Sequence, residues 1–100
     1  MGNRNRIFTG LLDAAYALDE QAAGRDPELS RVLSGAITLD TLSRRRALDA
    51  DLQEAAFCLE RVVTESNWNL DAEGRARAAT LASMTRVFAN RYAEKVARED

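Results

Sequence analysis

Residues 47–63, ALDADLQEAAFCLERVV, repeat apolar side chains at intervals of three and four positions. That spacing is typical of one face of an α-helix and does not match the two-residue period of a strand. We expect the buried stripe of this helix to comprise Leu48, Leu52, Ala55, Ala56, Leu59, Val62 and Val63. A long amphipathic helix therefore anchors the predicted fold.

The start of this long helix is predicted at Thr38, and its end at about Ser66. With Thr38 as the N-cap, Ile37 and Leu42 have the spacing of a hydrophobic staple. The competing start is Ser43. It is less favourable because it would place the arginines of residues 44–46 against the positive end of the helix dipole.

Three further helices are predicted on either side. The first runs from about Ile7 to Ala23, with Gly24 at the position of a C-terminal cap. A two-turn helix starts at residues 26–28, Asp-Pro-Glu, has Leu29, Val32 and Leu33 facing inward, and is ended by Gly35. The last helix starts near Asp71, and Trp68 in the preceding turn is expected to fold back over the end of the core.

The composition supports an all-helical fold, because the chain is rich in alanine and has one proline in 100 residues. The 46% hydrophobic and 30% charged residues are typical of a globular protein. We expect an all-α fold, a compact antiparallel helical bundle of three long helices plus one short helix. We expect residues 1–100 to form a single domain, with residues 1–6 and 98–100 frayed.

The side chains needed for most enzyme chemistry are missing. The chain has no histidine, Cys58 is its only cysteine, and its glycines are isolated rather than grouped in a phosphate-binding loop. We therefore expect no catalytic residues, no cofactor and no metal site. The absence of a secretory signal or a membrane span favours a cytoplasmic location. Lys95 is the only lysine among 14 basic residues, a bias towards arginine that points to a GC-rich bacterium or its phage.

The arginine run Arg44, Arg45 and Arg46 is the first candidate for binding. A short helix ended by Gly35 and followed by these arginines would resemble the order of a helix-turn-helix DNA-binding unit. The net charge of −2 is unusual for a nucleic-acid binder. The run could instead pair with Asp40, Asp49 and Asp51, or contact an acidic protein partner or RNA.

Phe57 is the second candidate, because it points away from the buried stripe of its helix. Its neighbours at helical spacing include Arg46, Glu54 and Arg61. Another part of the chain could cover Phe57, or it could be an exposed anchor for a partner, since aromatic and arginine side chains are enriched at interface hot spots.

A strip of Phe8, Leu12 and Tyr16 on the first helix is the third candidate. The strip either packs in the core or forms an exposed docking or dimer surface.

Together these features favour a non-enzymatic protein-binding module, a bacterial or phage-encoded inhibitor or adaptor. Its partner would be a larger protein or nucleoprotein assembly, for example a CRISPR effector or the transcription machinery. The alternatives are a DNA-binding regulator that uses Arg44–Arg46, with direct nucleic-acid contact, and a structural homodimer through the first helix. No membrane partner is expected.

Overall fold

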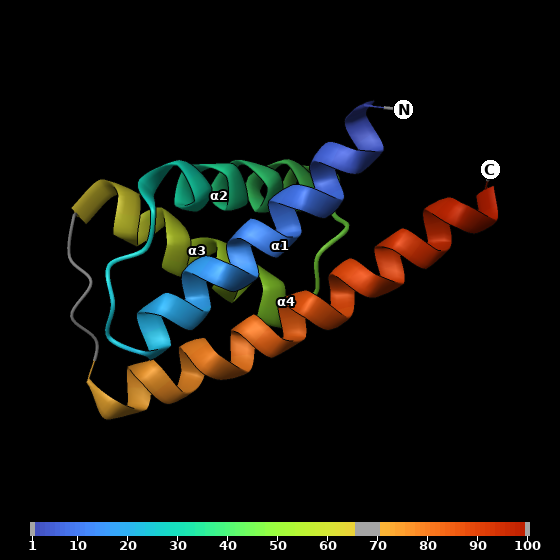
Figure 1. Ribbon diagram of the computed structural model, residues 1–100. Helices are drawn as coiled ribbons and strands as arrows, with labels where there is room; N and C mark the ends of the chain where they lie inside the picture. The colour runs from blue at the N-terminus through green and yellow to red at the C-terminus, as the bar shows by residue number, and fades with distance from the viewer. Residues whose placement is uncertain (1, 66–70, 100) are drawn as a thin grey trace.

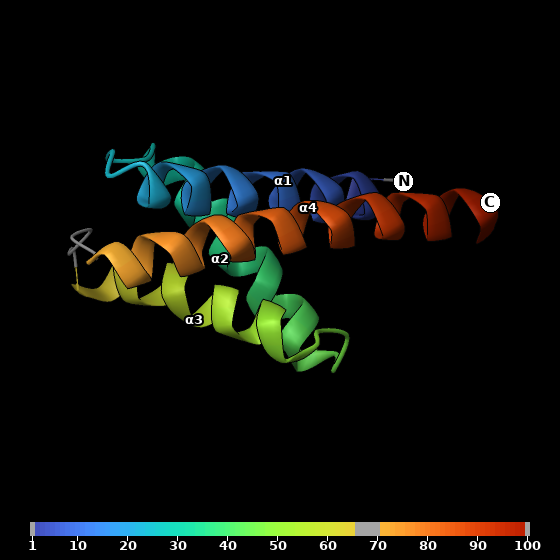
Figure 2. The same ribbon diagram turned by 90° about the horizontal axis from the view of Figure 1, so that it is seen from below.

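The computed structural model describes residues 2–65 and 71–99, which form four helices and no strand. The helices are α1 (Gly2–Ala22), α2 (Leu29–Arg44), α3 (Ala50–Glu65) and α4 (Ala72–Glu99). α1 and α4 lie side by side and run in opposite directions in both views (Figures 1 and 2). The Cα radius of gyration is 12.9 Å, close to the roughly 13 Å expected of a compact chain of 100 residues. The prediction of a compact all-helical fold is confirmed.

Leucines from all four helices fill the centre of the molecule. Their fully buried members are Leu11, Leu18, Leu39, Leu52, Leu59 and Leu81. The predicted stripe of α3 is confirmed at Leu52, Ala55, Leu59 and Val62, all of which are buried. Each buried leucine contributes about 1.5–3 kcal/mol through the loss of apolar surface from water, so the core holds the helices in fixed relative positions.

Gly35 does not end a helix, because α2 continues through it for nine more residues to Arg44. A Cβ atom built on Gly35 would lie 2.6 Å from the Cα atom of Ala14, so this glycine permits close contact between α2 and α1. The predicted short second helix, the N-cap at Thr38 and the hydrophobic staple of Ile37 and Leu42 are therefore wrong. Ile37 lies instead on the exposed side of α2.

The actual break between α2 and α3 spans residues 45–49. Arg46 has a φ of 56°, and its N–H donates to the carbonyl of Ser43. The carboxylate of Asp49 accepts a 2.9 Å hydrogen bond from the N–H of Leu52, as an N-cap does, and α3 begins at the next residue. The alternative start at Ser43 is therefore also wrong, and Leu48 is buried in the connection rather than in the helix.

Two other predicted caps are confirmed. Gly24 follows the end of α1 with a φ of 74°, and the N–H of Gly74 donates a 2.7 Å hydrogen bond to the carboxylate of Asp71 at the start of α4. The N-cap of α2 is Glu28 rather than Asp26.

The outermost helices reach further than predicted. α1 begins at Gly2, and α4 extends to Glu99, so both include positions where fraying was expected. The predicted end of α3 at Ser66 and the predicted burial of Trp68 lie outside the described residues.

Candidate functional site

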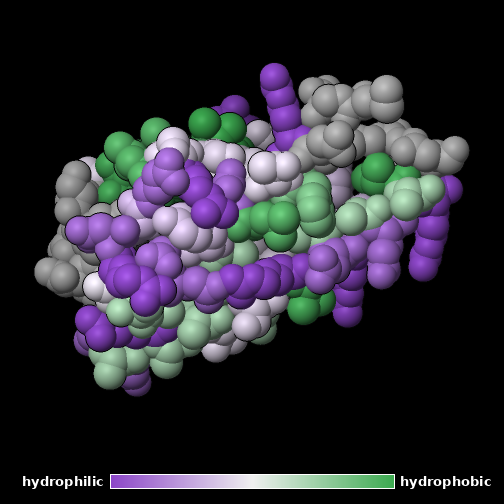
Figure 3. Space-filling view, viewed as in Figure 1, coloured by the Kyte–Doolittle hydropathy of each residue, from purple (hydrophilic) through white to green (hydrophobic). Residues whose placement is uncertain are grey.

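The outer face of α2 carries a row of apolar side chains that remain exposed. Leu29, Leu33 and Ile37 are four residues apart, and all three are exposed, Ile37 to 64%. Figure 3 shows apolar surface along the upper edge of the molecule, over α2. We call these three residues the α2 ridge. Its exposure shows that α2 has two apolar faces, of which only one contributes to the core.

A groove of about 480 Å³ lies between α2 and α3. Half-buried apolar side chains, including Ala36, Ala56 and Val63, form part of its lining, and Ile37 and Phe57 line it from the two helices. We call it the α2–α3 groove. Ile37 and Phe57, on adjoining helices, therefore flank a single depression. A partner could pack against these two side chains and also fill the groove between them.

Phe57 is 60% exposed and faces away from the core, as its position in the helical pattern predicts. The guanidinium carbon of Arg61, one turn further along α3, lies 6.0 Å from the centre of the ring. This distance is at the outer limit of a cation–π contact. The ring is therefore held on a rigid helix with most of its surface open.

A second depression of about 670 Å³ lies on the other side of α2, against the first half of α1. We call it the α1–α2 hollow. It is lined by Arg6, Ile7, Thr9, Ser34, Ile37, Thr38, Thr41 and Arg45. Ile37 therefore contributes to both depressions.

The arginine run lies at the end of α2 and not at the front of a helix. Arg44 forms an ion pair of 3.1 Å with Asp40, whereas Arg45 lies in the α1–α2 hollow and Arg46 is in the turn. Because residues 29–44 form one continuous helix, the predicted helix-turn-helix arrangement around Gly35 is wrong. The arginines are exposed, so the structure leaves their predicted binding role open.

Comparisons with protein-family models, with curated proteins and with solved structures give no match for this chain. The role of this surface is therefore inferred from the exposure, charge and position of its own residues.

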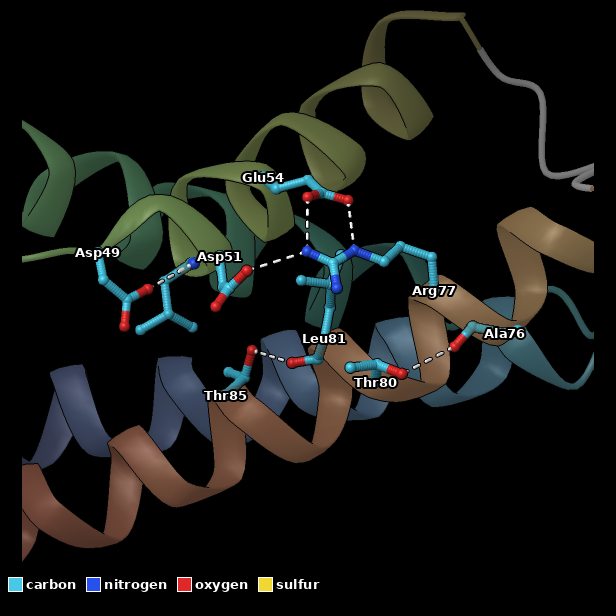
Figure 4. A network of polar contacts seen from close by, with 9 residues as sticks. Asp49, Asp51, Glu54, Ala76, Arg77, Thr80, Leu81 and Thr85 are labelled. Atoms are coloured by element: carbon cyan, nitrogen blue, oxygen red, sulfur yellow. Dashed lines mark hydrogen bonds and ion pairs between the residues drawn. The ribbon is translucent and has the colours of Figure 1, made fainter.

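Glu54 does not belong to the groove, because it points towards α4. Its two carboxylate oxygens each accept a 2.8 Å hydrogen bond from Arg77, which also donates to Asp51 at 3.0 Å (Figure 4). The hydrogen bonds from Arg77 lower the pKa of Glu54. The hydrogen bonds that Arg77 makes to Glu54 and Asp51 raise its own pKa. This network links α3 to α4.

The strip on α1 is mostly used inside the molecule. Phe8 packs against the core, and the Tyr16 hydroxyl accepts a 3.3 Å hydrogen bond from the N–H of Glu28. The guanidinium of Arg31 lies 3.6 Å from the centre of the Tyr16 ring. Leu12 is the exposed member, at 38%.

Three further features of the described residues concern thiol reactivity, metal binding and membrane insertion. Cys58 is half-buried, and this burial raises the pKa of its thiol, which keeps it in the less reactive protonated form. Among the described residues there is no group of three or more potential metal ligands. Nor does any helix among them have the length and apolar character required to cross a bilayer.

Sequence reasoning missed the α2 ridge, because it assigned Leu29 and Leu33 to the core and Ile37 to a cap. The assignment of Ile37 followed from ending the helix at Gly35, whereas Leu29 and Leu33 were placed inward together with Val32. If the helical pattern is continued through that glycine, positions 29, 33 and 37 form a second stripe beside the buried stripe of Val32 and Leu39, and the ridge becomes visible in the sequence.

Proposed function

We propose that this chain is a non-enzymatic protein-binding module, a small antiparallel helical bundle that covers a surface of a larger protein or nucleoprotein assembly. The observation that carries the proposal is the exposure of Phe57 and Ile37 together in the α2–α3 groove. A bacterial or phage-encoded inhibitor or adaptor in the cytoplasm fits this mode of action, and a CRISPR effector or the transcription machinery exemplifies the class of partner.

The energetics favour these two side chains as anchors. Removing a phenylalanine or isoleucine side chain completely from water contributes about 1.5–3 kcal/mol to binding. Because both side chains are more than half exposed, more than half of this gain is available when a partner covers them. Each is carried on a helix held by the core, so binding orders little additional backbone. Surrounding polar side chains, such as Gln53 and Glu60, would form the rim that excludes water.

The two alternatives have less support. A DNA-binding regulator would need another way to present Arg44–Arg46, because α2 is continuous where the turn of a helix-turn-helix was predicted. A homodimer through α1 would rest mainly on Leu12, because Phe8 and Tyr16 are half-buried within the protomer.

The test is capture of a partner by immobilised protein from lysates of GC-rich bacteria, comparing the wild type with Phe57→Ala and Ile37→Ala. Val87→Ala is the matched control, since Val87 is an exposed apolar residue on α4. We expect a protein that is retained by the wild type and by Val87→Ala and lost from both groove variants. Circular dichroism should show equal helical content in all four proteins. The same retained proteins on every column would refute the proposal.

A further inference from the structure

The two depressions that flank the α2 ridge differ in charge. The α2–α3 groove has carboxylates from Asp40 and Glu60 as well as the guanidinium of Arg44 in its lining. The α1–α2 hollow has two arginines, Arg6 and Arg45, four hydroxyl side chains and no carboxylate in its lining. One side of the ridge is therefore positively charged, although the whole chain has a net charge of −2.

The charges of the α1–α2 hollow are available for a ligand. Within the described ranges, the side chains of Arg6 and Arg45 form no hydrogen bond or ion pair, whereas Arg25, Arg31 and Arg77 each contact a carboxylate. Backbone N–H groups already satisfy the last carbonyls of α2, those of Thr41, Leu42 and Ser43. The arginines at this end are therefore not required to cap the helix.

We propose that the α1–α2 hollow receives an acidic segment of a protein partner, with a carboxylate side chain held by Arg6 and Arg45 and an apolar neighbour packed on Ile7 and Ile37. This proposal rests on the proposed function, and it names the chemistry of the partner. Guanidinium–carboxylate hydrogen bonds are charge-assisted and stronger than neutral ones. The hydroxyls of Thr9 and Ser34 add donors for further carboxylate oxygens.

A protein segment fits the hollow better than a nucleic acid does. Two isoleucines contribute to the lining, and one of them, Ile37, also belongs to the apolar α2 ridge. A phosphate backbone has no apolar groups that could pack against this ridge. The carboxylates Asp40 and Glu60 in the adjoining groove would repel phosphates. An acidic amphipathic helix could place its carboxylates in the hollow and its apolar side chains across α2.

The experiment measures fluorescence anisotropy of a labelled amphipathic peptide made of glutamate, leucine and alanine. Its affinity is compared for the wild type, for Arg6→Gln/Arg45→Gln and for Arg91→Gln/Arg98→Gln. The last variant removes two exposed positive charges from α4 and is the matched control. Two further probes are the same peptide with lysine in place of glutamate and a single-stranded oligonucleotide.

We expect the acidic peptide to bind the wild type and the control equally, within about twofold, and to bind Arg6→Gln/Arg45→Gln at least about tenfold more weakly. The lysine peptide should not bind. Failure of the acidic peptide to bind, or equal loss in the control, overturns the proposal. Tighter binding of the oligonucleotide through the same two arginines overturns it in favour of nucleic acid.

The capture experiment separates this inference from the proposed function. If Arg6→Gln/Arg45→Gln retains a partner that Phe57→Ala loses, the protein-binding function stands and the acidic segment does not. If Phe57→Ala and Ile37→Ala capture the same proteins as the wild type, the proposed function fails whatever the peptide does.

Discussion

Gly35 of α2 lies directly against the backbone of Ala14 in α1, and a Cβ atom on Gly35 would be 2.6 Å from the Ala14 Cα and 2.7 Å from its nitrogen. Gly10 of α1 and Thr38 of α2 make a second close contact in the same interface, between α1 and the next turn of α2. Two glycines, one from each helix, therefore bring α1 and α2 together.

Gly35→Ala should destabilise the protein. The atoms that the new methyl group would meet belong to the backbone and cannot rotate away, so strain should reach the upper end of the range of about 1–3 kcal/mol for overpacking. Alanine recovers roughly 1 kcal/mol through its helix propensity. We expect a net loss of about 1–2 kcal/mol in urea unfolding. Ser34→Ala in the same helix is the control and should change stability little, and an unchanged midpoint for Gly35→Ala would disprove the close packing.

Asp49→Ala should lower the free energy of unfolding by about 1 kcal/mol, because the Leu52 N–H loses its capping carboxylate. Asp49→Ser retains a capping oxygen and should recover most of this loss. Thermal unfolding followed by circular dichroism measures both. Equal stability of the alanine and serine variants would show that α3 is not capped at this residue.

Arg46→Gly should stabilise the fold. Arg46 has a φ of 56°, a left-handed conformation that costs a residue with a Cβ atom about 1 kcal/mol and costs glycine little. Arg45, with a φ of −85°, provides the control, since Arg45→Gly should give no gain. A higher melting temperature for Arg46→Gly alone is the expected result, and a gain of equal size for both variants would contradict it.

The fold could be predicted where a residue is compatible with a single structural role. It could not be predicted where a residue is compatible with two such roles. Apolar spacing gave the buried stripe of α3, and Asp71 and Gly24 are unambiguous caps. Gly35 is compatible with a helix end and with close helix packing, and only the position of Ala14 decides between them. The period of its own helix predicted that Phe57 faces away from the buried stripe, but whether another part of the chain covers it depends on the fold. The α1–α2 hollow likewise depends on how two helices pack and could not be predicted from either helix alone.

Acidification should weaken the link between α3 and α4. Because the pKa of Glu54 is lowered in the folded protein, its stabilising contribution is complete above its ordinary value near 4.5 and is lost as the pH falls through the lower folded value. Glu54→Gln should therefore be less stable than the wild type at neutral pH, and the difference should shrink on acidification below about pH 4. Thermal melts across this range measure it. Glu60→Gln, on the same helix, is the control, and a difference independent of pH would exclude the Arg77 contact as its cause.

Ile37 is a shared wall of two depressions, and a single side chain can therefore couple their occupants. A molecule that shifts the rotamer of Ile37 from one side would change the shape of the depression on the other side. By thermodynamic reciprocity, each occupant must then alter the affinity for the other by the same factor. A partner segment that crosses α2 would contact Ile37 from both depressions. Its two halves would bind cooperatively if they prefer the same Ile37 rotamer, and they would compete if they prefer different ones.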